Sequence, residues 1–270
     1  MTGNDWIPCT YKGSHYIIQA RACQRDGFVA NMKILALDTS SPRGSIALLE
    51  DDELTAELRL TSADTHSARL LSGVEYLLSA AGWRLQECGL IAAGIGPGSF
   101  TGIRIGVATA LGLAQSIGCA LAPVSGLDAL ASAVARLLSP GNRDEPAIGI
   151  AMDASRGQIY YAEYRVRGGR LCAAGKPSLR STDLARAAMG RRRLLLAGDG
   201  AVRYAAELGI ARGGVRRLVA LDLFLACPVG RLAFSRKRSW VRGEYLAAEP
   251  LYIRPPDALV NRARAKGRGR

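Results

Sequence analysis

The sequence contains few of the residues on which metal and thiol sites depend. Histidine occurs only at His15 and His66, and none of the six cysteines belongs to a C-x-x-C pair. A structural zinc site needs four Cys or His ligands at close spacing, so the sequence does not support one. The cysteine spacing gives no disulfide framework either, and we expect reduced thiols.

Long apolar runs and familiar catalytic motifs are also lacking. No apolar run approaches the roughly 20 residues that cross a membrane. The N-terminus does not have the basic, apolar and small-residue pattern of a signal peptide, so we expect a cytoplasmic protein without membrane attachment. Neither Gly-x-Ser-x-Gly nor His-Glu-x-x-His occurs, and hydrolase chemistry therefore has no support.

The chain does contain enough apolar sequence for a core. Its 270 residues, 49% of them hydrophobic, suffice for one large or two small globular domains. The net charge of +13 is uneven, because residues 180–270 hold 20 Lys and Arg against 7 Asp and Glu, which accounts for the whole excess. Such a block can attract RNA phosphates, and a compositional bias toward Arg and Ala explains it equally well.

The most informative stretch is 94–107, which reads Gly-Ile-Gly-Pro-Gly-Ser-Phe-Thr-Gly-Ile-Arg-Ile-Gly-Val. The apolar run before it predicts a buried strand, and apolar residues at helical spacing follow it. Gly96 and Gly98 permit positive φ or close approach of another group, and Ser99 can cap the helix. These three are weak phosphate candidates, because N–H groups at such a turn can bind an anion. The alternative is a tight turn that packs a helix on a sheet.

Two segments 115 residues apart resemble each other. A buried strand over 33–37 ends in Asp38-Thr39-Ser40, and another over 147–152 ends in Asp153-Ala154-Ser155. Each is followed by a glycine turn and a second strand, which indicates two related lobes of alternating strands and helices. Asp38 (with Thr39 beside it) and Asp153 could bind Mg²⁺ between the lobes, or each could cap its own hairpin through backbone N–H groups.

Composition also divides the chain. Residues 1–31 show no periodicity, and we expect a disordered extension there. We assign 32–140 to an N-terminal lobe and 141–256 to a C-terminal lobe, with a Ser-, Pro- and Gly-rich linker over 139–146. The Arg- and Gly-rich end, 257–270, reads as a disordered basic tail.

Taken together, these motifs resemble one family, TsaB (also called YeaZ), of the bacterial tRNA threonylcarbamoyladenosine system. The resemblance covers about 32–255. It rests on four segments: Ile34-Leu35-Ala36-Leu37-Asp38-Thr39-Ser40, the helix beginning His66-Ser67-Ala68-Arg69-Leu70-Leu71, Gly96-Pro97-Gly98-Ser99-Phe100-Thr101-Gly102, and Met152-Asp153-Ala154-Ser155-Arg156-Gly157.

The resemblance implies an α/β fold of the two-lobed actin-like ATPase (ASKHA, ribonuclease H-like) class, with duplicated βββαβαβα lobes. It implies a heterodimer through the N-terminal lobe with the paralogue TsaD, which transfers threonylcarbamoyl to N6 of adenosine 37 in tRNAs reading ANN codons. A small ATPase, TsaE, joins the complex, and a homodimer is expected when the chain is alone. The family member itself is expected to be a non-catalytic scaffold, and tRNA contact is expected to be indirect or through the basic C-terminal region.

The resemblance also assigns residues. The catalytic paralogue holds its metal through a His-x-x-x-His pair, and Gly126 and Leu130 align with that pair here, so we expect neither metal nor transfer chemistry in this chain. The helices that start at His66 and Thr101 should dock the partner. On that basis the expected interface residues are His66, Leu70, Val74, Leu77, Ile103, Val107 and Leu111.

Two other functions stay open at this point. One is an active actin-like kinase or ATPase that uses Asp38 and Asp153 with Mg²⁺-ATP, although the second lobe has no clear adenosine-binding Gly-Gly pattern. The other is a metallopeptidase, which the missing metal histidines argue against. ATP and Mg²⁺ are also conceivable ligands of a complex with the partner rather than of this chain.

Overall fold

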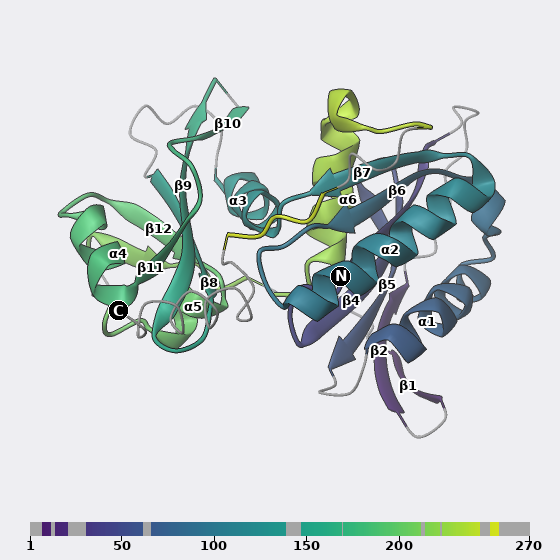
Figure 1. Cartoon of the computed structure of the whole chain (residues 1–270), viewed down its shortest axis with the longest axis horizontal. Helices are drawn as coiled ribbons and strands as arrows, with labels where there is room; N and C mark the ends of the chain where they lie inside the picture. Colours follow the sequence, from purple (N-terminus) through teal and green to yellow (C-terminus); the bar gives the residue numbers. More distant parts are fainter. Residues whose placement is uncertain are drawn as a thin grey trace, which may run out of the picture.

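The chain forms two β-sheets that lie side by side, each with its own helices (Figure 1). The computed structural model describes residues 7–11, 14–20, 31–61, 66–138, 147–168, 170–211, 214–221, 223–243 and 249–253. The side chains of 7–20 and 66–68 are not described. The predicted linker at 139–146 and the basic tail at 257–270 therefore lie outside the described residues.

The first lobe is built on a seven-stranded sheet, of which five strands follow the order β5-β4-β3-β6-β7. The first three strands are an antiparallel meander, and β6 and β7 run parallel to β3. In chain order the elements are β3 (Lys33–Asp38), β4 (Arg43–Glu50), β5 (Glu53–Thr61), α1 (His66–Ala80), η1 (Leu85–Glu87), β6 (Cys88–Gly94), α2 (Phe100–Ile117), β7 (Ala120–Val124) and α3 (Gly126–Arg136).

The second lobe repeats this plan, with strand order β10-β9-β8-β12-β13 and one extra strand, β11, paired to β9. Its elements are β8 (Ala147–Asp153), β9 (Gln158–Arg167), β10 (Arg170–Ala173), β11 (Ser178–Ser181), α4 (Thr182–Met189), β12 (Leu194–Ala197), α5 (Asp199–Arg203), β13 (Arg216–Leu218), α6 (Ala226–Ser235) and η2 (Lys237–Ser239). The predicted α/β fold and its repeated strand and helix succession are confirmed.

The last helix of each lobe packs on the other lobe. Helix α3 follows the first sheet in sequence but packs against β8 and β9, whereas α6 follows the second sheet and packs against β3, β4 and β6. One apolar core consequently runs through both lobes and includes residues of both helices, such as Leu127 and Val229. Because α3 and α6 each pack on the other lobe, buried apolar area holds the two sheets together in addition to the linker.

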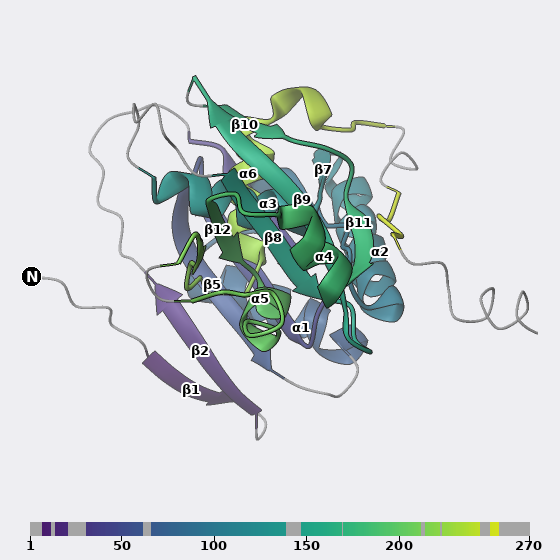
Figure 2. The ribbon, with the colours of Figure 1, turned by 90° about the vertical axis from the view of Figure 1, so that its left-hand side faces the viewer.

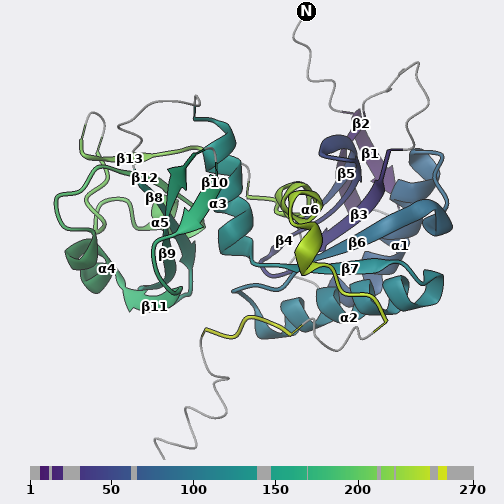
Figure 3. The same cartoon turned by 90° about the horizontal axis from the view of Figure 1, so that it is seen from above.

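Helices α1 and α2 cover the opposite face of the first sheet and lie next to each other (Figure 3). A second apolar core fills the space between them and the sheet. Helix α2 begins at the cap residue Ser99, whose Oγ accepts from the Gly102 N–H at 3.2 Å, and ends at Gly118, which has a left-handed φ of 67°. Both features follow the predicted turn and helix over 96–114.

The expectation of a disordered extension is wrong for two segments of 1–31. Strands β1 (Ile7–Tyr11) and β2 (Ser14–Ala20) form an antiparallel hairpin, and β2 pairs with β5, aligning Ile18 with Leu58 (Figure 2). The physical reason is the outer edge of β5, which presents unpaired N–H and C=O groups that another strand can satisfy. Sequence periodicity does not reveal such an edge, because it exists only once the sheet has formed.

Candidate functional site

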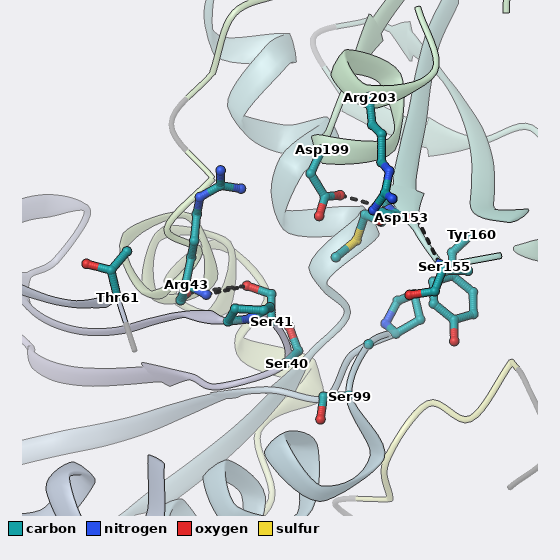
Figure 4. A pocket seen from close by; sticks show the side chains of 15 residues that line it. Ser40, Ser41, Arg43, Thr61, Ser99, Asp153, Ser155, Tyr160, Asp199 and Arg203 are labelled. Carbon is teal, nitrogen blue, oxygen red and sulfur yellow. Dashed lines mark hydrogen bonds and ion pairs between the residues drawn. The ribbon is translucent and has the colours of Figure 1, made fainter. Parts of the chain in front are cut away.

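The ends of β3 and β8 meet at a cleft between the two lobes. The cavity has a volume of about 950 Å³ and is lined by the β3–β4 turn, the glycine-rich turn before α2, the β8–β9 turn and α5 (Figure 4). Polar side chains reach it from both lobes, among them Ser41 and Arg43 on one wall and Asp153 and Arg203 on the other. The two predicted strand ends therefore do converge on one site.

Asp38 lies below this cleft and not in its lining. Its side chain is fully buried, and its Oδ2 accepts a hydrogen bond from the Ser40 hydroxyl at 3.1 Å. Its Oδ1 has no hydrogen-bond partner among the described residues. Burial raises the pKa of Asp38 to about 6, against the lowering effect of its bonds to Ser40. A carboxyl group in this position stabilises its turn but does not reach a ligand in the cavity.

Asp153 occupies the corresponding position in the second lobe and is fully engaged. Its carboxylate accepts from the Ser155 N–H at 2.8 Å, from Arg203 Nη1 at 2.6 Å and from the Tyr204 hydroxyl at 3.3 Å. The Ser155 bond caps the hairpin, as one of the two interpretations of the sequence held. Ser155 and Arg156 have φ of 60° and 56°, a backbone conformation that non-glycine residues seldom adopt.

The glycine-rich turn packs on the β3 turn. The Ser99 N–H donates to the Ser40 carbonyl at 2.7 Å, and the Thr39 hydroxyl donates to the Gly102 carbonyl at 2.7 Å. A Cβ at Gly98 would overlap the Ser40 carbonyl oxygen, and one at Gly102 would overlap that of Thr39. These contacts favour the close-packing interpretation of the turn.

The phosphate candidates are thus placed as follows. Thr39 is buried and bonded to α2, and Gly96, with φ of 93°, is buried against Ile103. Gly98 and Ser99 line the cleft, but Ser99 uses its Oγ to cap α2. An anion entering the cleft would meet other groups first, namely Arg43 and Arg203, which sequence patterns did not single out. Neither Arg43 nor Arg203 lies in a recognisable motif. The two arginines come from different lobes and line one cleft only because the lobes pack side by side.

The cleft does not fit a Mg²⁺-nucleotide well. Asp38 is covered by protein, and Arg203 already neutralises Asp153. Asp199 uses Oδ1 to accept from the N–H groups of Asp153 and Gly200, and burial raises its pKa. Within the part of the chain that the structure describes, no group of three His, Cys, Asp or Glu side chains could hold a metal ion.

The predicted partner-interface residues with described side chains lie on the buried faces of their helices. Their apolar side chains point into the first lobe's outer core, because an amphipathic helix buries its apolar stripe on its own sheet. Leu70, Val74, Leu77, Ile103 and Val107 are at most 7% exposed, Leu111 is half-buried, and the His66 side chain lies outside the described residues. The outward face instead presents Leu71, which is 51% exposed, together with Arg104, Ala108 and Gly112.

Gly126 and Leu130, the positions aligned with metal histidines, belong to the core. The Gly126 N–H donates to the Gly96 carbonyl at 2.7 Å, and a Cβ there would lie 3.2 Å from Leu225 Cδ1. Leu130 is 1% exposed and packs in the core that joins the lobes. Neither glycine nor leucine carries an atom that coordinates a metal, so these two positions supply no metal ligand.

The thiols follow the expectation of reduced cysteines where they are described. Cys88, Cys119, Cys172 and Cys227 are free. Burial raises the pKa of Cys88 to about 12 and that of Cys227 to about 11, so both stay protonated at neutral pH. A protonated, buried thiol is a poor nucleophile, and these two act as small apolar core residues.

Comparison with known proteins agrees with the geometry. Residues 60–191 match the family model described as tRNA N6-adenosine threonylcarbamoyltransferase, TsaD. Two curated relatives, both named tRNA threonylcarbamoyladenosine biosynthesis protein TsaB, are 37% identical over 140 residues (*Bacillus subtilis*) and 36% identical over 134 residues (*Escherichia coli*). These matches cover 52% and 50% of this chain and 58% and 55% of the relatives, so the chain spans a little over half the length of the curated relatives that it matches.

A solved structure extends the likeness to both lobes. The crystal structure of YeaZ from *Pseudomonas aeruginosa* superposes with a TM-score of 0.66 at 28% identity, and the match covers 82% of this chain and 99% of that one. The duplicated sheets, the exchanged helices and the interlobe cleft define a protein of the two-lobed actin-like ATPase fold. Within that class, the chain is similar to TsaB proteins over about half of its length and to the YeaZ structure over most of it.

Proposed function

We propose that this protein is a non-catalytic scaffold subunit of the bacterial complex that adds threonylcarbamoyl to N6 of adenosine 37 in tRNAs reading ANN codons. The catalytic partner is the TsaD paralogue, TsaE joins the complex, and the assembly works in the cytoplasm. The names of the curated relatives supply the pathway. Gly126 and Leu130 support the non-catalytic assignment, because neither side chain can bind the metal that the resemblance places at the corresponding positions of the paralogue.

The partner surface in this proposal is the outward face of α1 and α2. Helix α2 is the one described helix whose length and composition would suit a membrane span, with a mean hydropathy of 1.2, yet only 33% of it is buried. The exposed residues of α2, among them Arg104, Ala108 and Gly112, lie beside the exposed Leu71 of α1 and form the surface that the proposal assigns to the partner. The small residues Ala108 and Gly112 leave room for a partner helix to approach, either from TsaD or from a second copy of this chain.

One observation favours a second candidate, an actin-like ATPase or kinase. The interlobe cleft is large, and it holds two carboxylates, Asp153 and Asp199, beside the cationic Arg43. The proposal of an active enzyme is weaker because these residues do not fit a Mg²⁺-nucleotide. ATP hydrolysis by the purified chain tests it directly: sustained turnover of the chain alone, at a rate that Asp153→Ala abolishes, would favour the enzyme over the scaffold.

Reconstitution is the decisive experiment for the scaffold. Threonylcarbamoylation of a tRNA reading ANN codons is measured with purified TsaD, TsaE and the other pathway proteins, with and without this chain. The proposal expects modification only when the chain is present, and expects an Asp153→Ala variant to support it as well as the wild type. Equal modification without the chain would refute the proposal. A deletion of 257–270 in the same assay tests whether the basic tail contributes tRNA contacts.

A further inference from the structure

The β9–β10 hairpin carries three arginines on one face. Arg167 pairs with Arg170 across the two strands, and Arg165 lies two residues before Arg167 on β9. Side chains two residues apart on a strand point to the same face, and so do directly opposed residues of an antiparallel pair. All three are exposed, and the hairpin projects from the second lobe (Figure 2).

The opposite face of the hairpin fixes this orientation. Val166 and Leu171 are paired across the strands and pack against the core that joins the lobes. Below the hairpin, the arginine-bearing face of β9 is covered by α4, where Tyr161 packs with Ala185 and Met189. Helix α4 covers the sheet only as far as about Glu163. The three arginines therefore lie on a rigid part of the sheet that no described helix covers.

The cluster is electrostatically uncompensated. Like charges directly opposite each other destabilise a strand pair, and Arg167 faces Arg170 in this way. Among the residues that the structure describes, none forms a hydrogen bond or ion pair with the guanidinium groups of Arg165, Arg167 or Arg170.

The nearest acid on this face cannot compensate the cluster. Glu163 receives Arg192 at 2.5 Å and 2.8 Å through its two oxygens, and it also accepts from the Tyr161 hydroxyl at 2.7 Å. Its charge is therefore already matched by an arginine that comes from the end of α4. Among the described residues, no acidic side chain relieves the repulsion between Arg167 and Arg170, and an external anion bound there would do so.

We propose that Arg165, Arg167 and Arg170 form a binding site for RNA backbone phosphates. Guanidinium groups match phosphate oxygens bidentately, and residues two apart on a strand repeat about every 7 Å, which suits the serial charges of a phosphodiester chain. The choice of RNA rests on the proposed function in tRNA modification. The site lies before residue 180, in the part of the chain whose charges sum to zero, so the basic excess of the last third does not explain it.

Binding of a tRNA transcript to the full-length chain over a series of salt concentrations tests this site. The double variant Arg167→Gln/Arg170→Gln is compared with a matched control, Arg84→Gln/Arg136→Gln, which removes two exposed first-lobe arginines and changes the net charge equally. The proposal expects the slope of log affinity against log salt to fall by about 2 in the hairpin variant and by much less in the control. Equal slopes, or wild-type chain that does not bind tRNA, would overturn it.

Arg167→Glu separates binding from folding. It replaces a like-charge pair with an opposite-charge pair facing Arg170, so thermal stability should rise or stay level while tRNA affinity falls about tenfold or more. A fall in both would mean that the arginine serves the fold. Binding of the same variant to vesicles of phosphatidylcholine and phosphatidylserine distinguishes RNA from a membrane surface. If Arg167→Glu lost vesicle binding but kept tRNA binding, the ligand of the site would be a membrane surface and not RNA. Because binding is measured without the modification reaction, a failed reconstitution would refute the proposed function and leave this result standing.

Discussion

Asp38 and Asp153 end corresponding strands of the two lobes, but only Asp153 is paired with a cation. Arg203 lies 2.6 Å from the Asp153 carboxylate, whereas Asp38 is fully buried with the Ser40 hydroxyl as its side-chain partner. The same residue type at the same place in the repeat therefore lies in two different surroundings, one buried without a cation and one paired with an arginine. The two lobes share the turn that follows the aspartate but differ in the charged groups around it. Asp38 and Asp153 therefore do not form one symmetric metal site.

The pH dependence of stability should report the burial of Asp38. Its pKa is about 6 in the folded chain and 3.8 ordinarily, so the folded state binds the proton more tightly. Stability is then highest where both states are protonated, below about pH 4, and is lost as the pH rises from about 4 to 6. The loss is on the order of 3 kcal/mol.

Urea unfolding of the wild type and Asp38→Asn between pH 4 and pH 8 measures this contribution. The variant cannot titrate, so the difference in unfolding free energy between the two proteins should change across pH 4–6 and level off above it. Asp199, whose pKa is also raised, is present in both proteins and cancels in the difference. A difference that does not vary with pH would show that Asp38 titrates normally.

Two glycines of α2 should respond in opposite ways to alanine. At Gly102 the new Cβ would overlap the Thr39 carbonyl oxygen, a backbone atom that cannot move without shifting the β3 turn, and we expect a loss of about 3 kcal/mol. At Gly112 nothing lies within 4 Å, and alanine should stabilise the helix by about 0.5–1 kcal/mol. Urea midpoints of the two variants test this, and equal effects would contradict the packing of the turn on β3.

Local sequence patterns predicted the helices, strands and turns well, but they did not predict which faces of the helices are exposed. The strand ends at Asp38 and Asp153, the cap at Ser99 and the lobe repeat all follow from short-range periodicity and turn chemistry. The same periodicity identified the stripe of α1 and α2 that is buried on their own sheet, whereas the surface that we propose for the partner is the exposed complement of that stripe.

Features that depend on contacts between distant segments could not be predicted. The exchange of α3 and α6 between lobes and the addition of β2 to β5 are set by which faces and edges remain uncovered after each sheet forms. Arg43 and Arg203 face one cleft only because the two lobes are joined in this way. No pattern within ten residues of either arginine carries that information.

Asp128 should hold the two lobes together through one carboxylate. It lies on α3 and accepts from the Tyr164 hydroxyl of β9 at 2.7 Å and from Arg236 Nη1, just after α6, at 2.7 Å. Burial raises the pKa of Tyr164, so its hydroxyl remains a donor. Asp128→Ala would leave that buried hydroxyl without its partner, and we expect a loss of about 2–3 kcal/mol in urea unfolding.

Asp52→Ala is the matched control for Asp128. Asp52 forms an ion pair of similar length with Arg136, at 3.0 Å, but both side chains are more than 40% exposed. Solvent screening limits such a pair to less than about 1 kcal/mol. Similar losses in the two variants would mean that the Asp128 network contributes no more than a surface ion pair.

The outward face of α1 and α2 should carry partner affinity without carrying stability. Leu71→Arg and Gly112→Arg place a charge where a partner would have to bury it, and we expect each to weaken binding to TsaD about tenfold or more. Both positions are open to solvent in the free chain, so the unfolding free energy should change by less than about 0.5 kcal/mol in Leu71→Arg. In Gly112→Arg it should rise by about 0.5–1 kcal/mol, because arginine, like alanine, is a better helix former than glycine. Isothermal titration calorimetry with purified TsaD measures the affinity, and Leu184→Arg on α4, a position 64% exposed in the other lobe, is the control. Unchanged binding in the first two variants, or an equal loss in the third, would move the interface away from this face.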